Sequence, residues 1–193
     1  MGSWSWTGFA LSAIAAAAVF TNGCATHPPL PQYGLVTNFS LTDQTGAPFS
    51  SVQSLDHRVW IADFIYTTCP GPCPRMSSQM HDVQKALAGD SDLRLVSFTV
   101  DPAHDTPPVL TEYAKHFEAE PGKWFFLTGP LPEINRLDQK VFLLGDGGSA
   151  LEHSTRFVLV DRNSRIRGYY ASFEPNAISN LIADAKTLLK EKS

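Results

Sequence analysis

Positive charge is scarce in this sequence, and it is nowhere concentrated. The 193 residues include 15 Lys and Arg against 19 Asp and Glu, so the formal net charge is −4. Proteins that bind nucleic acid usually gather basic side chains on one face. We therefore expect no nucleic-acid partner. A disordered chain is also excluded, because 43% of the residues are hydrophobic and can form a core.

Cysteine is scarce as well. The sequence has three, at Cys24, Cys69 and Cys73. A domain that is held together mainly by disulfides needs more than this, so a disulfide scaffold is excluded. Because the number is odd, at least one thiol needs an explanation of its own.

Charged residues are missing from the N-terminal part of the chain, where the first is Asp43. Residues 9–20 form an apolar stretch whose length is typical of a signal peptide. A membrane-spanning helix would need about 20 apolar residues. The pair Gly23 and Cys24 follows this stretch and resembles the cleavage and lipidation site of bacterial lipoproteins.

These features predict a leader at residues 1–23, a proline-rich linker at 24–33 and one folded domain at 34–193. Cys24 would carry the lipid anchor. Simple cleavage and an uncleaved anchor remain alternatives, since Thr21 stands where lipoproteins usually have Leu. All three versions tether or release the domain outside the cytoplasm, on the periplasmic side of a bacterial envelope, where disulfides can persist.

The rest of the chain alternates between strand and helix patterns. Residues 36–51 predict a β-hairpin, and the apolar run 59–66 predicts a central strand that is covered on both faces. The later pattern predicts, in order, a helix at 75–87, a strand at 93–100, a helix at 107–117, a strand at 124–127, a helix at 132–141, a hairpin at 156–171 and a helix at 176–190. This order is typical of an α/β domain with helices on both faces of a mixed sheet.

Two of the cysteines lie in the segment YTTCPGPCPRM, residues 66–76, directly after the central strand. Each cysteine precedes a proline, which disfavours helical backbone and predicts an extended conformation for both. Pro74 suits the first position of a helix, so we expect Cys73 to be its N-cap. The positive end of the helix dipole would then lower the pKa of a cysteine thiol.

Three residues separate the two cysteines, and this spacing permits two kinds of chemistry. A disulfide can form if the α-carbons come within about 7 Å. Both sulfurs can also bind one metal ion, provided that a third ligand exists. His153 is the best candidate for that ligand, because it precedes a strand and follows a glycine-rich loop. His104 lies in a turn after another strand, and we do not assign it as a ligand.

Three segments together resemble the Sco/SenC family of copper chaperones: FIYTTCPGPCPRM, TVDPAHDTPPVL and EHSTRFVLVD. The resemblance covers residues 36–189. It implies a thioredoxin-like fold, copper ligation by Cys69, Cys73 and His153, and assembly of the dinuclear copper centre of cytochrome c oxidase. The chain departs from the family at His104, where Arg is common, and in the glycine-rich loop before His153.

The resemblance also implies partners. The main one is the copper-centre subunit of cytochrome c oxidase, and others are a periplasmic copper carrier or a thiol reductant. Thiolates suit Cu(I), and imidazole suits both Cu(I) and Cu(II). Zinc remains an alternative, because two Cys, one His and a water also form a zinc site. The affinity order and the family resemblance both favour copper.

Asp63 interrupts the apolar central strand six residues before Cys69. A carboxylate is costly to bury there, and burial raises its pKa. Thioredoxins have an acidic residue at the same spacing, beneath their dithiol. We hypothesise that Asp63 exchanges protons with the cysteine pair. The alternative is an Asp that bonds to neighbouring backbone.

Two classes of function therefore stand. One is an extracytoplasmic metallochaperone that delivers copper. The other is a thiol–disulfide oxidoreductase that uses Cys69 and Cys73. A peroxide-scavenging enzyme on the same fold is a weaker third possibility, which the proline-flanked pair does not suggest.

Overall fold

The computed structural model describes residues 1–2, 29–144 and 154–191. Its centre is one mixed sheet with the strand order β1-β8-β7-β4-β5-β6-β2-β3. The strands are β1 (Gly34–Leu35), β2 (Ser40–Asp43), β3 (Pro48–Ser50), β4 (Val59–Ile65), β5 (Leu93–Thr99), β6 (Trp124–Thr128), β7 (Arg156–Val160) and β8 (Arg165–Ala171). β4, β5 and β6 run parallel, whereas β7 is antiparallel to both β4 and β8.

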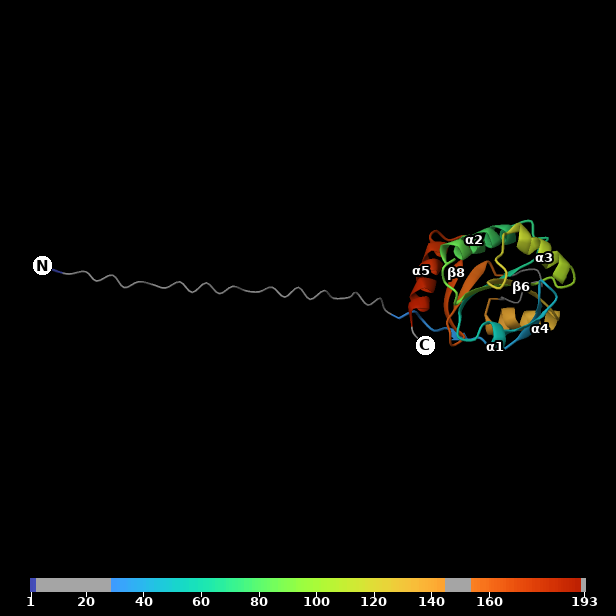
Figure 1. The fold of residues 1–193 in the computed structure, drawn as a ribbon, viewed down its shortest axis with the longest axis horizontal. Helices are drawn as coiled ribbons and strands as arrows, with labels where there is room; N and C mark the ends of the chain where they lie inside the picture. Colours follow the sequence, from blue (N-terminus) through green and yellow to red (C-terminus); the bar gives the residue numbers. More distant parts are fainter. Residues whose placement is uncertain (3–28, 145–153, 192–193) are drawn as a thin grey trace.

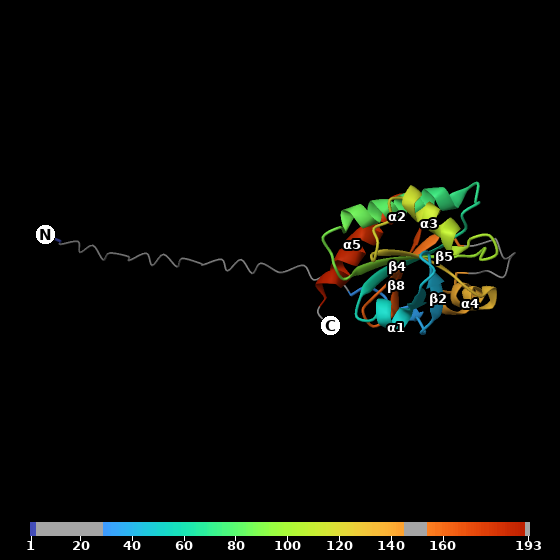
Figure 2. The ribbon, with the colours of Figure 1, turned by 45° about the vertical axis from the view of Figure 1, so that its right-hand side comes forward.

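Helices cover both faces of the sheet, as the sequence predicts (Figures 1 and 2). On one face lie α2 (Pro72–Ala86), α3 (Pro107–His116) and α5 (Ala177–Lys190). On the other lie α1 (Ser51–Ser54), α4 (Leu131–Arg136) and the π-helical turn η1 (Leu137–Val141). No helix within the described residues is long and apolar enough to span a membrane.

The central strand is β4, and all of its residues are buried. Successive side chains of a strand point to opposite faces. Accordingly, Ile61 and Ile65 pack against the α2 side, and Trp60 and Phe64 pack against the α4 side. Asp63 shares the odd-numbered face with Ile61 and Ile65, so its carboxyl group points towards α2.

The predicted N-terminal hairpin is confirmed as β2 and β3, at one edge of the sheet. The carboxylate of Asp43 accepts hydrogen bonds from the backbone N–H groups of Thr45 and Ala47. Gly46 completes the turn with a φ of +85°, a conformation that glycine adopts without a steric penalty. β1 and α1 are not predicted from the sequence, because two to four residues are too few for a recognisable period.

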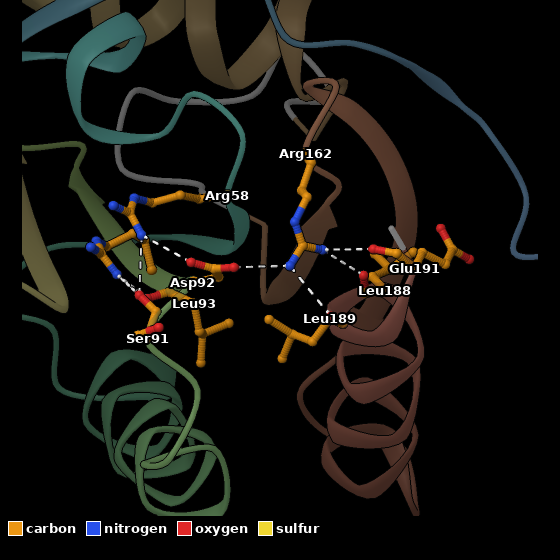
Figure 3. A network of polar contacts seen from close by, with 9 residues as sticks. Arg58, Ser91, Asp92, Leu93, Arg162, Leu188, Leu189 and Glu191 are labelled. Carbon is orange, nitrogen blue, oxygen red and sulfur yellow. Dashed lines mark hydrogen bonds and ion pairs between the residues drawn. The ribbon is translucent and has the colours of Figure 1, made fainter. Parts of the chain in front are cut away.

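Charged side chains link the sheet to α5 near the N-terminal end of β4. The β7–β8 turn lies there, since Trp60 pairs with Val160. Arg162 follows β7 and donates to the carbonyl oxygens of Leu188, Leu189 and Glu191 at the end of α5, and to Asp92 (Figure 3). These contacts tie the last helix to the sheet.

A second arginine, Arg167 on β8, binds the segment that precedes β1 at the same end of the sheet. It is almost fully buried and lies 2.9 Å from the Asp161 carboxylate. It also donates to the carbonyl oxygens of Leu30 and Pro31, each at 2.9 Å. The segment before β1 therefore joins the domain at the end of the sheet opposite to the carboxyl end of β4.

Candidate dithiol centre

Both cysteines of the C-x3-C segment lie at the carboxyl end of β4. The strand ends at Ile65, and a turn follows in which the Cys69 N–H donates to the Tyr66 carbonyl oxygen at 3.3 Å. Cys73 lies in the first turn of α2, neither thiol is part of a disulfide, and both are buried. Sites in α/β sheets commonly form at such strand ends.

The predicted start of the helix is wrong. Gly71 is the N-cap, Pro72 occupies the first helical position, and Cys73 is helical rather than extended. Two prolines fit in the first turn because the N–H groups they lack would have no partner within the helix. The proline effect on the preceding residue is a preference. Here it is outweighed, because helical Cys73 buries its side chain completely.

The two thiols differ in their environment. Although burial raises it, the pKa of Cys69 is lowered by hydrogen bonds from the Cys73 N–H, the Cys73 thiol, the Gly71 N–H and the Tyr66 hydroxyl. Burial raises the pKa of Cys73 far above its usual value, and the charges of Cys69 and Asp63 add to this. The Cys69 thiol therefore ionises at a lower pH than the Cys73 thiol.

Asp63 is completely buried beneath this pair. Burial raises its pKa from 3.8 to about 7, and the Ser97 hydroxyl offsets only part of that rise. Within the described residues, neither of its carboxyl oxygens has a partner in hydrogen-bonding geometry. The Ser97 oxygen accepts a hydrogen bond from Trp124 Nε1 at 3.0 Å instead. The expected alternative, a bond to neighbouring backbone, is absent from the described residues.

Two tyrosines near the thiols were not predicted. The Tyr66 hydroxyl hydrogen-bonds to Cys69, and this contact raises the tyrosine pKa. Tyr113 on α3 lies 3.0 Å from the Ser77 hydroxyl, one helical turn after Cys73. Burial raises the Tyr113 pKa, with Cys73 and Asp63 adding to the effect. Tyr66 directly precedes the segment Thr67–Cys69, and nothing in the sequence marks it. Its hydrogen bond to Cys69 is visible only in the tertiary structure.

Two other predicted residues, His153 and Cys24, lie outside the described residues. In the parts that the structure describes, no three His, Cys, Asp or Glu side chains are grouped to hold a metal ion. His104 is exposed, and its Nδ1 lies 2.8 Å from Asp101 Oδ2. The structure thus brings together Cys69, Cys73 and Asp63, and places His104 on the surface in a hydrogen bond with Asp101.

This sheet and its dithiol loop define a class: a thioredoxin-like domain with a C-x3-C pair at the start of its first long helix. The SCO1/SenC family model matches residues 28–190. The chain therefore belongs to the SCO1/SenC family.

Curated relatives agree with this assignment. A SCO1 protein homolog of Bacillus subtilis is 34% identical over 158 residues, which are 79% of this chain and 81% of that protein. A protein of Stutzerimonas stutzeri, named as a candidate copper-binding protein, is 31% identical over 148 residues, covering 72% and 71% of the two chains.

Solved structures confirm the thioredoxin-like fold. A SCO1/SenC family lipoprotein from Bacillus anthracis has a TM-score of 0.73 and 30% identity, with 81% of this chain and 96% of that chain covered. BsSco, described as having a disulfide switch and as a member of the Sco family of cytochrome c oxidase assembly proteins, also has a TM-score of 0.73. It is 32% identical, with 86% of this chain and all of BsSco (100%) covered.

Proposed function

We propose that this protein is an extracytoplasmic copper metallochaperone that delivers copper to the dinuclear centre of cytochrome c oxidase. One observation carries the proposal: two buried thiols that are not joined in a disulfide face each other where α2 begins, and they differ in pKa. The Stutzerimonas stutzeri relative is named for copper binding, and BsSco for oxidase assembly. These relatives support the cargo and the partner.

The cargo is Cu(I), held by the sulfurs of Cys69 and Cys73. Soft thiolates prefer Cu(I), and binding releases the thiol protons. Hydrogen bonds lower the pKa of Cys69 and favour its thiolate, whereas burial favours the protonated form of Cys73, which would lose its proton when the metal binds. The two sulfurs lie beyond the carboxyl end of β4 rather than within the strand, and copper would be passed to a partner at this end of the sheet.

His153 is the proposed third ligand. β7 is antiparallel to β4, and its first residue, Arg156, therefore lies towards the edge where β4 ends. The chain enters β7 at the end of the sheet that holds the thiols. Imidazole binds both Cu(I) and Cu(II), so the same three residues could keep the metal if it were oxidised.

A tether at Cys24 would hold the domain at the outer face of the cytoplasmic membrane. The lipoprotein from Bacillus anthracis, which is 30% identical, supports this location. The copper donor would be another periplasmic carrier, and a thiol reductant would return an oxidised Cys69–Cys73 pair to the dithiol. Only the dithiol can bind copper through both sulfurs.

The test is a titration of the reduced protein with Cu(I) against a colorimetric chelator. Cys69→Ala and Cys73→Ala should each lower the affinity on the order of a thousandfold, since each removes a sulfur ligand. His153→Ala should lower it about a hundredfold, with exposed His104→Ala as the matched control that changes nothing. Unchanged affinity in His153→Ala would refute the three-ligand site. Tighter binding of zinc than of copper would favour the zinc alternative.

Thiol–disulfide exchange is a second candidate, and Asp63 favours it. In this reaction the Cys69 thiolate attacks a partner disulfide and forms a mixed disulfide. The Cys73 thiol then gives its proton to Asp63, displaces the partner's sulfur and closes the Cys69–Cys73 bond. The partner takes up two electrons and two protons and becomes a dithiol; one proton is passed on from Asp63, and the other is the proton that Cys69 released on ionising. The split thiol pKa values suit these roles.

His153→Ala also separates the two functions. It should cripple copper binding and leave the rate of exchange with a disulfide substrate unchanged, because imidazole has no part in exchange. Asp63→Asn should do the reverse, slowing exchange without weakening copper binding. If His153→Ala slows exchange as much as it weakens copper binding, the two activities share a step and the separation is wrong.

A further inference from the structure

The second signature segment, residues 99–110, has no role in copper ligation or exchange as described above. Within it, Asp105 is completely buried, like Asp63. Unlike Asp63, it has hydrogen-bond donors on both carboxyl oxygens. Its Oδ1 accepts the Thr67 hydroxyl at 2.5 Å, and its Oδ2 accepts the Thr67 N–H at 3.1 Å and the Thr99 hydroxyl at 2.5 Å.

Thr67 is the residue through which Asp105 reaches the dithiol. It is a central residue of the turn that the Cys69 N–H closes onto the Tyr66 carbonyl oxygen. Asp105 holds this one residue by its backbone and by its side chain. Two contacts on a single residue fix both the position and the rotation of the turn that leads to Cys69.

The other contacts anchor Asp105 to the sheet. Thr99 ends β5, and the adjoining Val100 N–H donates to the Ile65 carbonyl oxygen at the end of β4. The Thr99 hydroxyl oxygen accepts the Asp101 N–H at 3.0 Å, and the Asp105 N–H donates to the Asp101 carbonyl oxygen at 2.9 Å. The carboxylate is therefore rigid relative to β4 and β5.

We propose that Asp105 is a positioning residue that holds the Thr67 turn and thereby keeps Cys69 facing Cys73. It touches neither sulfur. It acts by raising the effective concentration of one thiol with respect to the other, on which both chelation of one ion and closure of a disulfide depend. The chelation part rests on the proposed copper function, whereas disulfide closure needs only the cysteine pair.

The experiment uses a matched pair at Thr67, which is only partly buried. Thr67→Val removes the hydroxyl and keeps the shape, and Thr67→Ser keeps the hydroxyl. Asp105→Asn is the direct variant. The first measurement is the equilibrium with glutathione: one disulfide of glutathione takes two electrons and two protons from the dithiol and yields two glutathione thiols. The second measurement is Cu(I) affinity.

We expect Thr67→Val and Asp105→Asn to lower two constants about tenfold: the equilibrium constant for disulfide formation with glutathione, and the association constant for Cu(I). The reason is that one thiol is then less often near the other. Thr67→Ser should match the unchanged protein. The free energy of unfolding is measured for all variants. If it falls in Thr67→Val while both constants stay unchanged, Asp105 only stabilises the fold and the proposal is overturned. An increase in either constant would overturn it as well.

Two outcomes keep this proposal separable from the copper function. If the unchanged protein binds no Cu(I), the copper function fails, and the glutathione constant alone still decides the role of Asp105. If Asp105→Asn does not fold, Thr67→Val against Thr67→Ser decides it, since that pair leaves the buried carboxylate and its Thr99 contact in place.

Discussion

The two ends of the central strand β4 differ in how their buried polar groups are paired. At its N-terminal end, Arg167 and Asp161 are both buried, and the arginine is paired with the carboxylate and with two carbonyl oxygens. At its C-terminal end, Asp63 is buried with no hydrogen-bond partner among the described residues, beneath two thiols that are not joined in a disulfide. One end is stabilised by complete pairing, and the other keeps groups whose protons can still move.

The same contrast recurs within the C-terminal end, between two buried carboxyl groups. Asp105 receives three donated hydrogen bonds, and Asp63 receives none in good geometry. Burial without partners raises the pKa of Asp63 to about 7. A partnered carboxylate can serve as a rigid support, whereas an unpartnered one is suited to accept and release a proton near neutral pH.

The largest expected effect on the free energy of unfolding concerns Asp63, at the C-terminal end of β4. The folded-state pKa of Asp63 lies above its ordinary value, so the protonated form stabilises the fold. That stability is fully present below pH 3.8 and is lost as the pH rises through about 7. At about 1.4 kcal/mol per pKa unit, the loss amounts to about 4 kcal/mol.

Asp63→Asn removes this titration while keeping the shape of the side chain. Its free energy of unfolding should therefore rise relative to that of the unchanged protein by about 4 kcal/mol between pH 4 and pH 8. Chemical denaturation over this pH series, with the cysteines kept reduced, measures the difference. Parallel pH profiles for the two proteins would show that Asp63 is not the titrating group.

A somewhat smaller effect is expected at the N-terminal end of β4, where Arg167 pairs with Asp161. Arg167→Met should lower the free energy of unfolding by about 3 kcal/mol, because it leaves the Asp161 carboxylate buried without its cation. Adding Asp161→Asn should recover part of this loss, since the remaining charge is then removed. Cu(I) affinity should stay unchanged in both proteins. A parallel loss of copper affinity would show that the two ends are not independent.

The smallest effect compares two arginines that contact one carboxylate. Arg58 and Arg162 both pair with Asp92, but only Arg162 also donates to the carbonyl oxygens at the end of α5 (Figure 3). Arg162→Ala should cost about 1 kcal/mol of unfolding free energy, and Arg58→Ala less than about 0.5 kcal/mol. Equal costs would mean that the ion pair, rather than the helix end, carries the stabilisation.

Much of the fold is predictable from local patterns. The strand β4, which is apolar except for Asp63, the apolar stripe of α2 and both hairpins were predicted because their patterns are long or their turns are distinctive. Two elements, β1 and α1, were not predicted because they are too short to show a periodic pattern. The start of α2 was placed too late, since the packing of Cys73 outweighed a local proline preference.

The candidate site was predicted in part. The sequence was sufficient for Cys69, Cys73 and Asp63 to be singled out, because two thiols flanked by prolines and a carboxylate in an apolar strand are conspicuous. His153 and Cys24 remain predictions. Tyr66 and Asp105 were not singled out, because nothing in their own neighbourhoods distinguishes a tyrosine in a strand end or an aspartate in a turn.

The sequence by itself determined the dithiol, its three-residue gap, the helix that follows it and the family to which the chain belongs. The tertiary structure alone decided which thiol is buried more deeply, which carboxyl group lacks partners among the described residues, and that Asp105 contacts Thr67 across 38 residues of sequence. The physical reason is that pairing and burial depend on neighbours brought together by folding. Those neighbours set the pKa values and the positions of the reacting groups.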